Sequence, residues 1–223
     1  MTESQKLKME LLREFYCTKN PVEFCREAYK FLTDTSNDSS NVCGLCLERK
    51  EGIYLVYDDG SYNLFDDSIK NAVPEKVKYI GVVHDGHAFC LSLKSLGNHE
   101  LVKDYDCCTS EHPLYIDNEV EALFDWECIE RTKHIQEVGT SIPLKDGEYI
   151  PSLPMLVVMC HLKDKINEAL EFVGGDILED KNYWSATAYS ATYAWFVYFI
   201  NGAVYGYDKG LTFAVRAVAA FNF

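Results

Sequence analysis

The chain has 223 residues and a mass of 25.5 kDa, with 48% hydrophobic and 25% charged residues, the composition of a soluble globular protein with a buried core. Its formal net charge of −14 and its isoelectric point near 4.8 argue against nucleic acid and anionic membranes as partners. Nine cysteines, with no signal peptide and no apolar stretch of transmembrane length, predict thiols that are reduced where the protein is made.

We therefore expect synthesis in the cytoplasm without a signal peptide. The protein would then be cytoplasmic, or it would be released by lysis, as a virion component is.

The N-terminal part of the chain has the pattern of two helices followed by a linker. Apolar residues recur with helical spacing over residues 4–16. Asn20 is a plausible N-cap for a second helix, with Pro21 at its first position. Residues 33–41, with the sequence TDTSNDSSN, are polar and rich in turn formers. We expect residues 1–51 to be a small helical region that ends in a polar linker.

The pattern then becomes typical of strands. Residues 53–57, 77–83 and 88–93 are predicted strands, and the last two are joined at Asp85-Gly86, a strong short-range hairpin signal. This segment of the chain is expected to form an antiparallel sheet.

Helical signals return in the middle of the chain. Residues 118–138 have a helical pattern, Ser152 is a candidate N-cap for the next helix, and a further helix over about 164–173 is expected to stop at Gly174. Helices and hairpins are mixed without a regular strand–helix–strand alternation, which predicts the α+β class.

The last 41 residues are the most informative part of the sequence. Trp195, Val197 and Phe199 alternate with Phe196, Tyr198 and Ile200, so the two sets are expected on opposite faces of a strand that ends at an Asn201-Gly202 turn. An exposed face rich in Tyr and Phe is typical of a recognition surface, because large rings with few rotatable bonds give contact area at a low entropic cost.

Two cysteine pairs invite a metal or redox interpretation. Cys43-x-x-Cys46 lacks a second pair at similar spacing, and the adjacent Cys107 and Cys108 are poorly placed to ligate one metal ion. A redox pair would open a helix of a thioredoxin-like unit, whereas Cys43 follows the polar linker. We expect packed or free thiols at these positions and no metal.

His84 and His87 flank the Asp85-Gly86 turn and resemble a ligand pair, but no metal motif or carboxylate cluster in the sequence supports them. A hairpin tip that carries histidines is the expectation. A Cys/His nucleophilic pair stays open as an alternative, because such partners are adjacent in space and not in sequence. The sequence contains no glycine-rich phosphate loop and no nucleophile elbow, so no catalytic residue is predicted.

Several motifs occur in an order that matches a known family. They are YDDGSY (57–62), IGVV (80–83), GEYIPSL (147–153), IN (166–167), VGG (173–175), YWSAT (183–187), AWxVxFxNGxV (194–204) and VRAVxAF (215–221). In this order they resemble the variable proteins of diversity-generating retroelements, whose variable region ends a C-type lectin-like domain. They are also similar to related lectin-like domains of gut bacteria and their phages. Ala188 and Ala219 depart from the family, which usually has Glu and Arg there.

The resemblance implies which residues vary. In this family the retroelement mutates adenines, typically in AAC-type codons, so the variable positions exclude Lys, Glu, Gln, Met and Trp. Trp195 and Lys209 lie among these positions and are expected to be fixed. The positions expected to vary, and to bind the ligand, are Tyr189, Ser190, Ala191, Thr192, Tyr193, Phe196, Tyr198, Ile200, Ala203, Tyr205, Gly206, Tyr207, Asp208, Gly210, Leu211, Thr212 and Phe213.

We therefore expect an α+β protein with a helical region at 1–51 and a C-type lectin-like ligand-binding domain at 52–223, with a variable region at about 185–215. The expected partner is a protein or glycan on a target surface. Nucleic acid, membrane insertion, calcium, other metals and cofactors are not expected, and neither is catalysis. Two alternatives stay open: a phage or surface structural component that oligomerises through the same face, and an enzyme of the formylglycine-generating type.

Overall fold

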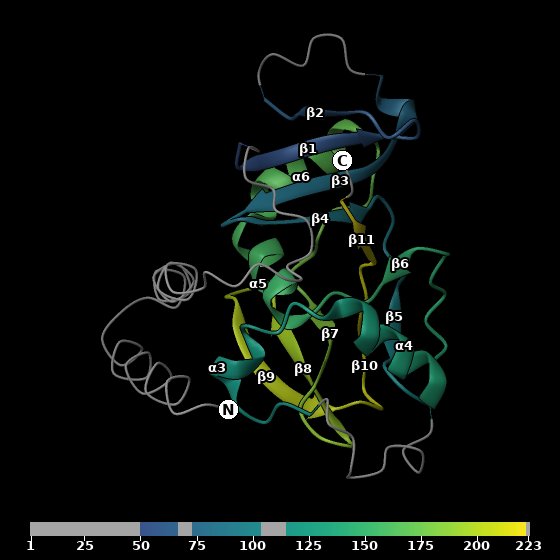
Figure 1. Cartoon of the computed structure of the whole chain (residues 1–223), viewed down its shortest axis with the longest axis vertical. Coiled ribbons are helices and arrows are strands. Elements are labelled where there is room, and N and C mark those ends of the chain that lie inside the picture. Colours follow the sequence, from purple (N-terminus) through teal and green to yellow (C-terminus); the bar gives the residue numbers. More distant parts are fainter. Residues whose placement is uncertain (1–49, 67–72, 104–114, 222–223) are drawn as a thin grey trace, which may run out of the picture. The chain divides into compact units, whose positions relative to one another are not determined.

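The computed structural model describes residues 50–66, 73–103 and 115–221 (Figure 1). The chain divides between Leu47 and Glu48 into two units, and all of these residues belong to the second. The two expected N-terminal helices, the linker and both cysteine pairs lie outside the described residues. In the described part, no helix is long and apolar enough to cross a membrane.

The first sheet is antiparallel and has the strand order β2-β1-β3-β4-β11-β6. Its central hairpin is the predicted one, since Asp85 and Gly86 join β3 to β4 with φ of 45° and 77°. Both residues thus have the positive φ that a two-residue type I′ turn requires. The strands are β1 (Gly52–Tyr57), β2 (Tyr62–Leu64), β3 (Val77–His84), β4 (His87–Ser92), β6 (Glu148–Tyr149) and β11 (Val218–Ala220).

The second sheet has the order β5-β10-β7-β8-β9 and lies below the first in Figure 1. It is mixed, because β10 pairs parallel with β7 while the other pairs are antiparallel. The predicted Asn201-Gly202 turn joins β8 to β9, and Gly202 has a φ of 74°. The strands are β5 (Asn98–Glu100), β7 (Asn182–Ala188), β8 (Tyr193–Tyr198), β9 (Ala203–Asp208) and β10 (Thr212–Ala214).

Four α-helices and one 3₁₀ helix accompany the sheets in the described residues: η1 (Pro74–Lys76), α3 (Glu119–Ala122), α4 (Cys128–Val138), α5 (Leu153–His161) and α6 (Lys163–Phe172). The helix expected over 118–138 is thus two helices, the first of which is capped by the Asn118 side chain. The helix expected after Ser152 is α5, but the Ser152 hydroxyl makes no capping bond. The last predicted helix is confirmed as α6, and Gly174 follows it with a φ of 71°.

The second sheet is covered by apolar side chains on both faces. Trp195, Val197 and Phe199 belong to a large core that includes β1, β3, β4 and the helices α5 and α6. Phe196 belongs to a second cluster on the opposite face, with Trp184 of β7 and residues of α4. The predicted alternation along β8 is therefore right. The face of the sheet opposite Trp195 is nevertheless buried over β7 and β10, and it becomes exposed to solvent only towards β9.

The expected fold class, α+β with a C-type lectin-like domain, is wrong. The described residues form a mostly β structure, in which eleven strands make two sheets and the four α-helices are 4 to 11 residues long. Four of these strands, β2, β5, β6 and β10, are not among those predicted from the sequence, because they have only two or three residues each and are too short to carry a periodic signal.

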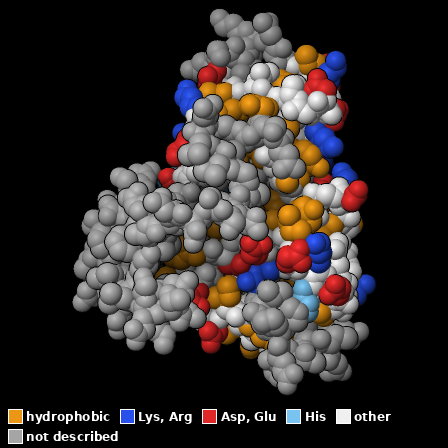
Figure 2. Space-filling model, in the orientation of Figure 1, with side chains coloured by type: hydrophobic (Ala, Val, Ile, Leu, Met, Phe, Trp, Pro, Cys, Tyr) orange, Lys and Arg blue, Asp and Glu red, His pale blue; other side chains and the backbone are white. Residues whose placement is uncertain are grey.

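Acidic and basic side chains are interspersed around small hydrophobic areas on the face that Figure 2 shows. Among the residues coloured in that view, no large area carries charge of a single sign. This face has the mixed charge of an ordinary solvated surface.

Candidate ligand-binding surface

Exposed aromatic and aliphatic side chains gather at the free edge of the second sheet. Five of the ten large hydrophobic side chains that are exposed in the described residues lie between positions 193 and 211. Strand β9 is the outer strand of its sheet and pairs with β8 along its whole length. The five side chains, with their exposed fractions, are Tyr193 (42%), Ile200 (57%), Tyr205 (54%), Tyr207 (50%) and Leu211 (39%).

A hollow of about 770 Å³ opens beside this edge. It lies between the 189–192 turn, which joins β7 to β8, and the 208–211 turn, which joins β9 to β10. Its volume is within the range of roughly 300–1,000 Å³ that is usual for ligand sites. All seven lining residues belong to the set predicted to vary: Tyr189, Tyr193, Gly206, Tyr207, Asp208, Gly210 and Leu211.

Tyr189 shapes the hollow by lying over the backbone of β9. A Cβ atom added to Gly206 would be only 3.0 Å from Tyr189 Cδ2, so the ring occupies space that most residues at position 206 would fill. The same ring packs edge-on against Trp195, with centroids 5.1 Å apart, and Trp195 Nε1 donates a hydrogen bond to Ile116 O at 2.7 Å. The tyrosine ring is therefore held between a buried tryptophan and a glycine.

Lys209 fastens the two turns together. It is only 4% exposed, and its ammonium group donates hydrogen bonds to Ser190 O and Ala191 O, both at 2.9 Å. Its backbone N–H donates to Thr192 O at 2.9 Å, and its own carbonyl accepts from Leu101 N at 2.9 Å. A lysine predicted to be fixed amid variable positions is thus a buried structural residue.

Other scaffold side chains also bond to the main chain in these turns or in the strands beside them. Trp184, which is fully buried, donates from Nε1 to Leu211 O at 3.2 Å and to His99 O at 3.1 Å. Ser185 Oγ donates to Trp195 O at 2.8 Å. Because a carbonyl acceptor is present whatever the side chain, the bonds to residues 190, 191 and 211 do not depend on which amino acid occupies those positions.

Some residues predicted to vary have structural roles of their own. Phe196 is 6% exposed and packs against Phe213 and Trp184, with ring centroids 4.8 and 6.1 Å away. Ser190 Oγ accepts from Tyr193 N at 3.0 Å, and Asp208 Oδ1 accepts from Gly210 N at 2.9 Å. Phe196 is thus a core residue and not a surface contact, because β10 and its neighbours cover that part of the sheet.

Sequence reasoning missed the segment that supports the surface from outside the C-terminal block. Ile116 N donates to Ala188 O at 2.9 Å, and Ile116 O receives the Trp195 bond. The ring of Tyr115 lies 5.5 Å from the Lys209 ammonium. No local pattern marks these two residues in the sequence, because they follow a stretch without periodicity and their partners are more than 70 positions away.

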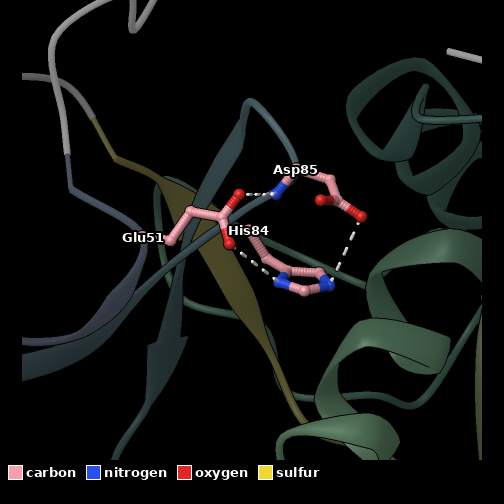
Figure 3. Close-up of side chains that lie close together, drawn as sticks. All are labelled: Glu51, His84 and Asp85. Atoms are coloured by element: carbon pink, nitrogen blue, oxygen red, sulfur yellow. Dashed lines mark hydrogen bonds and ion pairs between the residues drawn. The ribbon is translucent and has the colours of Figure 1, made fainter. Parts of the chain in front are cut away.

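His84, Asp85 and Glu51 form a second candidate site at the tip of the β3–β4 hairpin (Figure 3). Glu51 Oε2 lies 3.8 Å from His84 Nδ1, whereas Asp85 Oδ2 lies 3.6 Å from His84 Nε2. One potential ligand atom of each residue lies within 4.8 Å of the other two, a spacing that exposed acidic groups often have without a metal ion. The two closest contacts fall on opposite ring nitrogens of His84, whereas a metal ion binds an imidazole through one nitrogen, so the geometry does not favour a metal ion here.

His87, on the other side of the turn, takes a different partner. Its ring stacks on Trp126, with centroids 3.6 Å apart and planes within 4°. Burial lowers the pKa of His87 from 6.5 to about 4, against the opposing effect of Asp85. The two histidines predicted at this tip therefore flank the turn, but they do not converge on one point.

No protein-family model matches the chain, and no curated protein gives a significant match. Among solved structures, the chain is similar to a fimbrial protein from Bacteroides ovatus ATCC 8483, with 18% sequence identity and a TM-score of 0.46. The match covers 76% of this chain and 48% of the other, so this chain spans about half the length of that protein.

Proposed function

We propose that this protein binds a ligand through the hollow and the adjoining strand β9, and that a retroelement diversifies this surface. The surface is defined by Tyr189, Tyr193, Tyr205, Tyr207 and Leu211. One observation carries the proposal: every residue that lines the hollow belongs to the set predicted to vary, while Lys209 and Trp195, predicted to be fixed, are buried beneath it.

The way in which the turns are held supports this role. A surface that accepts many side chains needs a backbone whose position does not depend on them. Lys209 and Trp184 bond to the carbonyls of Ser190, Ala191 and Leu211, so those side chains can change without loss of these bonds. Positions 206 and 189 are different. Gly206 and the Tyr189 ring are in close contact, so the residue at one position limits which residues fit at the other.

The proposed role is binding and not catalysis. The partner would be a protein or glycan on a target surface. This protein itself would be carried either on a virion or on a cell. The exposed tyrosines supply large contact area with few rotatable bonds, which is how diversified paratopes bind.

Replacement of Tyr193, Tyr205 and Tyr207 together by Thr tests the proposal. These side chains are 42–54% exposed, and Thr keeps the strand propensity, so we expect the free energy of unfolding to fall by less than about 1.5 kcal/mol. Light scattering should give an unchanged oligomeric state. The matched control is Phe196→Thr, on the same strand pair but buried, which should cost about 3–5 kcal/mol.

Urea unfolding and light scattering of both variants distinguish a ligand surface from a part of the core and from a subunit interface. If the triple variant loses as much stability as Phe196→Thr, the tyrosines are part of the core. If it changes the oligomeric state, the surface is a subunit interface. Either result contradicts the proposed ligand surface.

A further inference from the structure

Strand β9 is a long and unprotected edge of the second sheet. In the described residues the two sheets end at four strands, which are β2 and β6 in the first sheet and β5 and β9 in the second. Three of these strands have only two or three residues, whereas β9 has six. Proteins usually protect a sheet edge by keeping it short, or with lysine, proline or a bulge. Residues 203–207 contain no charged residue and no proline, and their pairing with β8 is regular.

Alternate backbone groups of β9 point away from β8. Lys209 N donates to Thr192 O at 2.9 Å, so these two residues form a hydrogen-bonded pair that continues the register of β8 and β9. Hydrogen-bonded and non-hydrogen-bonded pairs alternate along antiparallel strands. The backbone groups of Val204 and Gly206 therefore point away from β8, while those of the residues beside them point towards it. In the described part of the chain, β9 pairs with no strand other than β8.

The apolar side chains on one face of the sheet continue to this edge. The rings of Tyr205 and Tyr207 pack on the buried Phe196, with centroids 5.8 and 6.4 Å away. Both tyrosines are nevertheless exposed, by 54% and 50%. A further strand with apolar residues at alternate positions would continue this row, because side chains of neighbouring strands pack in cross-strand pairs.

From the outward backbone groups and the apolar row we propose that an extended segment of a protein partner adds to β9 as a sixth strand of the second sheet. The inference rests on the proposed function and names the class of its ligand. In strand addition the main-chain hydrogen bonds supply affinity, while the side chains beside them select the sequence that fits. A surface whose side chains vary would thus keep a constant part of its binding energy.

Area and charge favour a segment of another protein over a second copy of this chain. Six residues of strand are about 20 Å long and a sheet with its side chains is about 10 Å thick, so an edge-to-edge contact covers ~200 Å². A stable interface covers ~800 Å² on each partner. Two copies would also repel each other, since each carries a net charge of −14. An extended segment, in contrast, can place its side chains on both faces of the sheet.

The inference is tested by titrating the ¹⁵N-labelled full chain with the peptide acetyl-Lys-Thr-Val-Thr-Val-Thr-Lys amide, which has valines on one face and lysines for solubility. The matched probe carries N-methyl groups on its central threonine and on the valine that follows. It has the same side chains and charge, but each of its edges lacks a donor. We expect saturable shifts of the Val204 and Gly206 amides in the millimolar range with the first peptide, and binding at least ~10-fold weaker with the second.

Hydrogen exchange detects the new bonds directly. In the free chain, the amides of Val204 and Gly206 should have lower protection factors than those of Tyr205 and Tyr207, which bond to β8. At a peptide concentration about five times the dissociation constant, exchange at Val204 and Gly206 should slow ~6-fold, because only the unbound fraction exchanges.

Matched variants localise the effect. Val204→Pro removes one outward N–H and its ring obstructs the edge, whereas Val204→Ala shortens the side chain and keeps the backbone groups. Proline is tolerated on an edge strand where its nitrogen faces solvent, so the chain should stay folded. We expect Val204→Pro to weaken peptide binding at least ~10-fold, and Val204→Ala to weaken it less than ~3-fold. The two peptides and the exchange rates use the unmodified chain, so the test does not depend on the proline variant.

Equal affinity for the two peptides, equal affinity of the two variants, or unchanged exchange at Val204 and Gly206 would overturn the inference. A dimer of the free chain that Val204→Pro dissociates would overturn it as well and would assign β9 to a second copy. Binding of neutral pyranoses at the same amides, with none of the peptide, would assign the surface to a glycan instead. A negative peptide result does not affect the stability and oligomer test of the proposed function, so failure of the two can be told apart.

Discussion

Gly206 and Tyr189 show how two positions on the proposed ligand surface constrain each other. The glycine lies under the tyrosine ring, and a Cβ at position 206 would approach Cδ2 and Cγ to 3.0 and 3.2 Å. Such contacts are closer than ordinary van der Waals separations, so either the ring moves or the pair is strained. Residues at 189 and 206 are therefore not independent, although both belong to the set predicted to vary.

A double-mutant cycle measures this coupling. Gly206→Ala should lower the free energy of unfolding by about 1 kcal/mol when Tyr189 is present, because the new methyl group displaces the ring. In the Tyr189→Ser background the same change should be close to neutral, since the space above position 206 is then open, and Ala suits a strand no less than Gly. The coupling energy should be at least ~0.5 kcal/mol. An equal cost in both backgrounds would show that the contact does not matter.

At the scale of elements, the structure depends on Lys209 to hold two turns that the sheet itself does not fix. The 189–192 and 208–211 turns project from β7–β8 and β9–β10, and the lysine bonds one to the other. Without its ammonium group, two carbonyl groups of the first turn would lose their donor. The hollow between the turns should then lose its shape before the sheet unfolds.

Lys209→Met tests this clamp, because it keeps most of the apolar stem and removes both bonds. We expect a loss of about 2–3 kcal/mol in the free energy of unfolding, the cost of removing a buried charged donor from its acceptors. The control is Lys181→Met, an exposed lysine paired with Glu179 on the surface, which should cost less than about 1 kcal/mol. Similar losses in the two variants would contradict a clamp role for Lys209.

Local elements could be predicted where the chain carries a local signal. The Asp85-Gly86 and Asn201-Gly202 turns predict the β3–β4 and β8–β9 hairpins. The alternation around Trp195 correctly predicts which side chains of β8 lie on each face of the sheet. Each of these depends on neighbours in sequence. The break between α3 and α4, in contrast, could not be predicted, because residues 118–138 have a helical pattern throughout and tertiary packing interrupts the helix.

Long-range pairing could not be predicted. Phe213 pairs with His99, and Val218 pairs with both Leu91 and Tyr149, in strands of two to six residues whose partners are distant in sequence. These contacts complete the two sheets and make the fold mostly β, so the expected α+β class failed at this point. The same packing buries Phe196, which strand parity alone places on the proposed ligand face.

At the scale of the whole molecule, a fixed framework lies beneath the surface proposed to vary. Two sheets and their helices share one large core, and the second cluster closes the far side of the second sheet. The exposed rings of β9 and its flanking turns add little to either core. A surface of this kind can change its ligand without changing the fold.

The most direct test of this separation is to sequence the gene and its neighbouring DNA across a growing population. We predict a reverse transcriptase gene, an adenine-rich near-repeat of the segment that encodes residues 185–215, and substitutions at the exposed positions around the hollow. Trp195 and Lys209 should stay constant, and position 196 should keep an apolar residue. Absence of the near-repeat, or substitutions that reach Lys209 as often as Tyr207, would contradict the account.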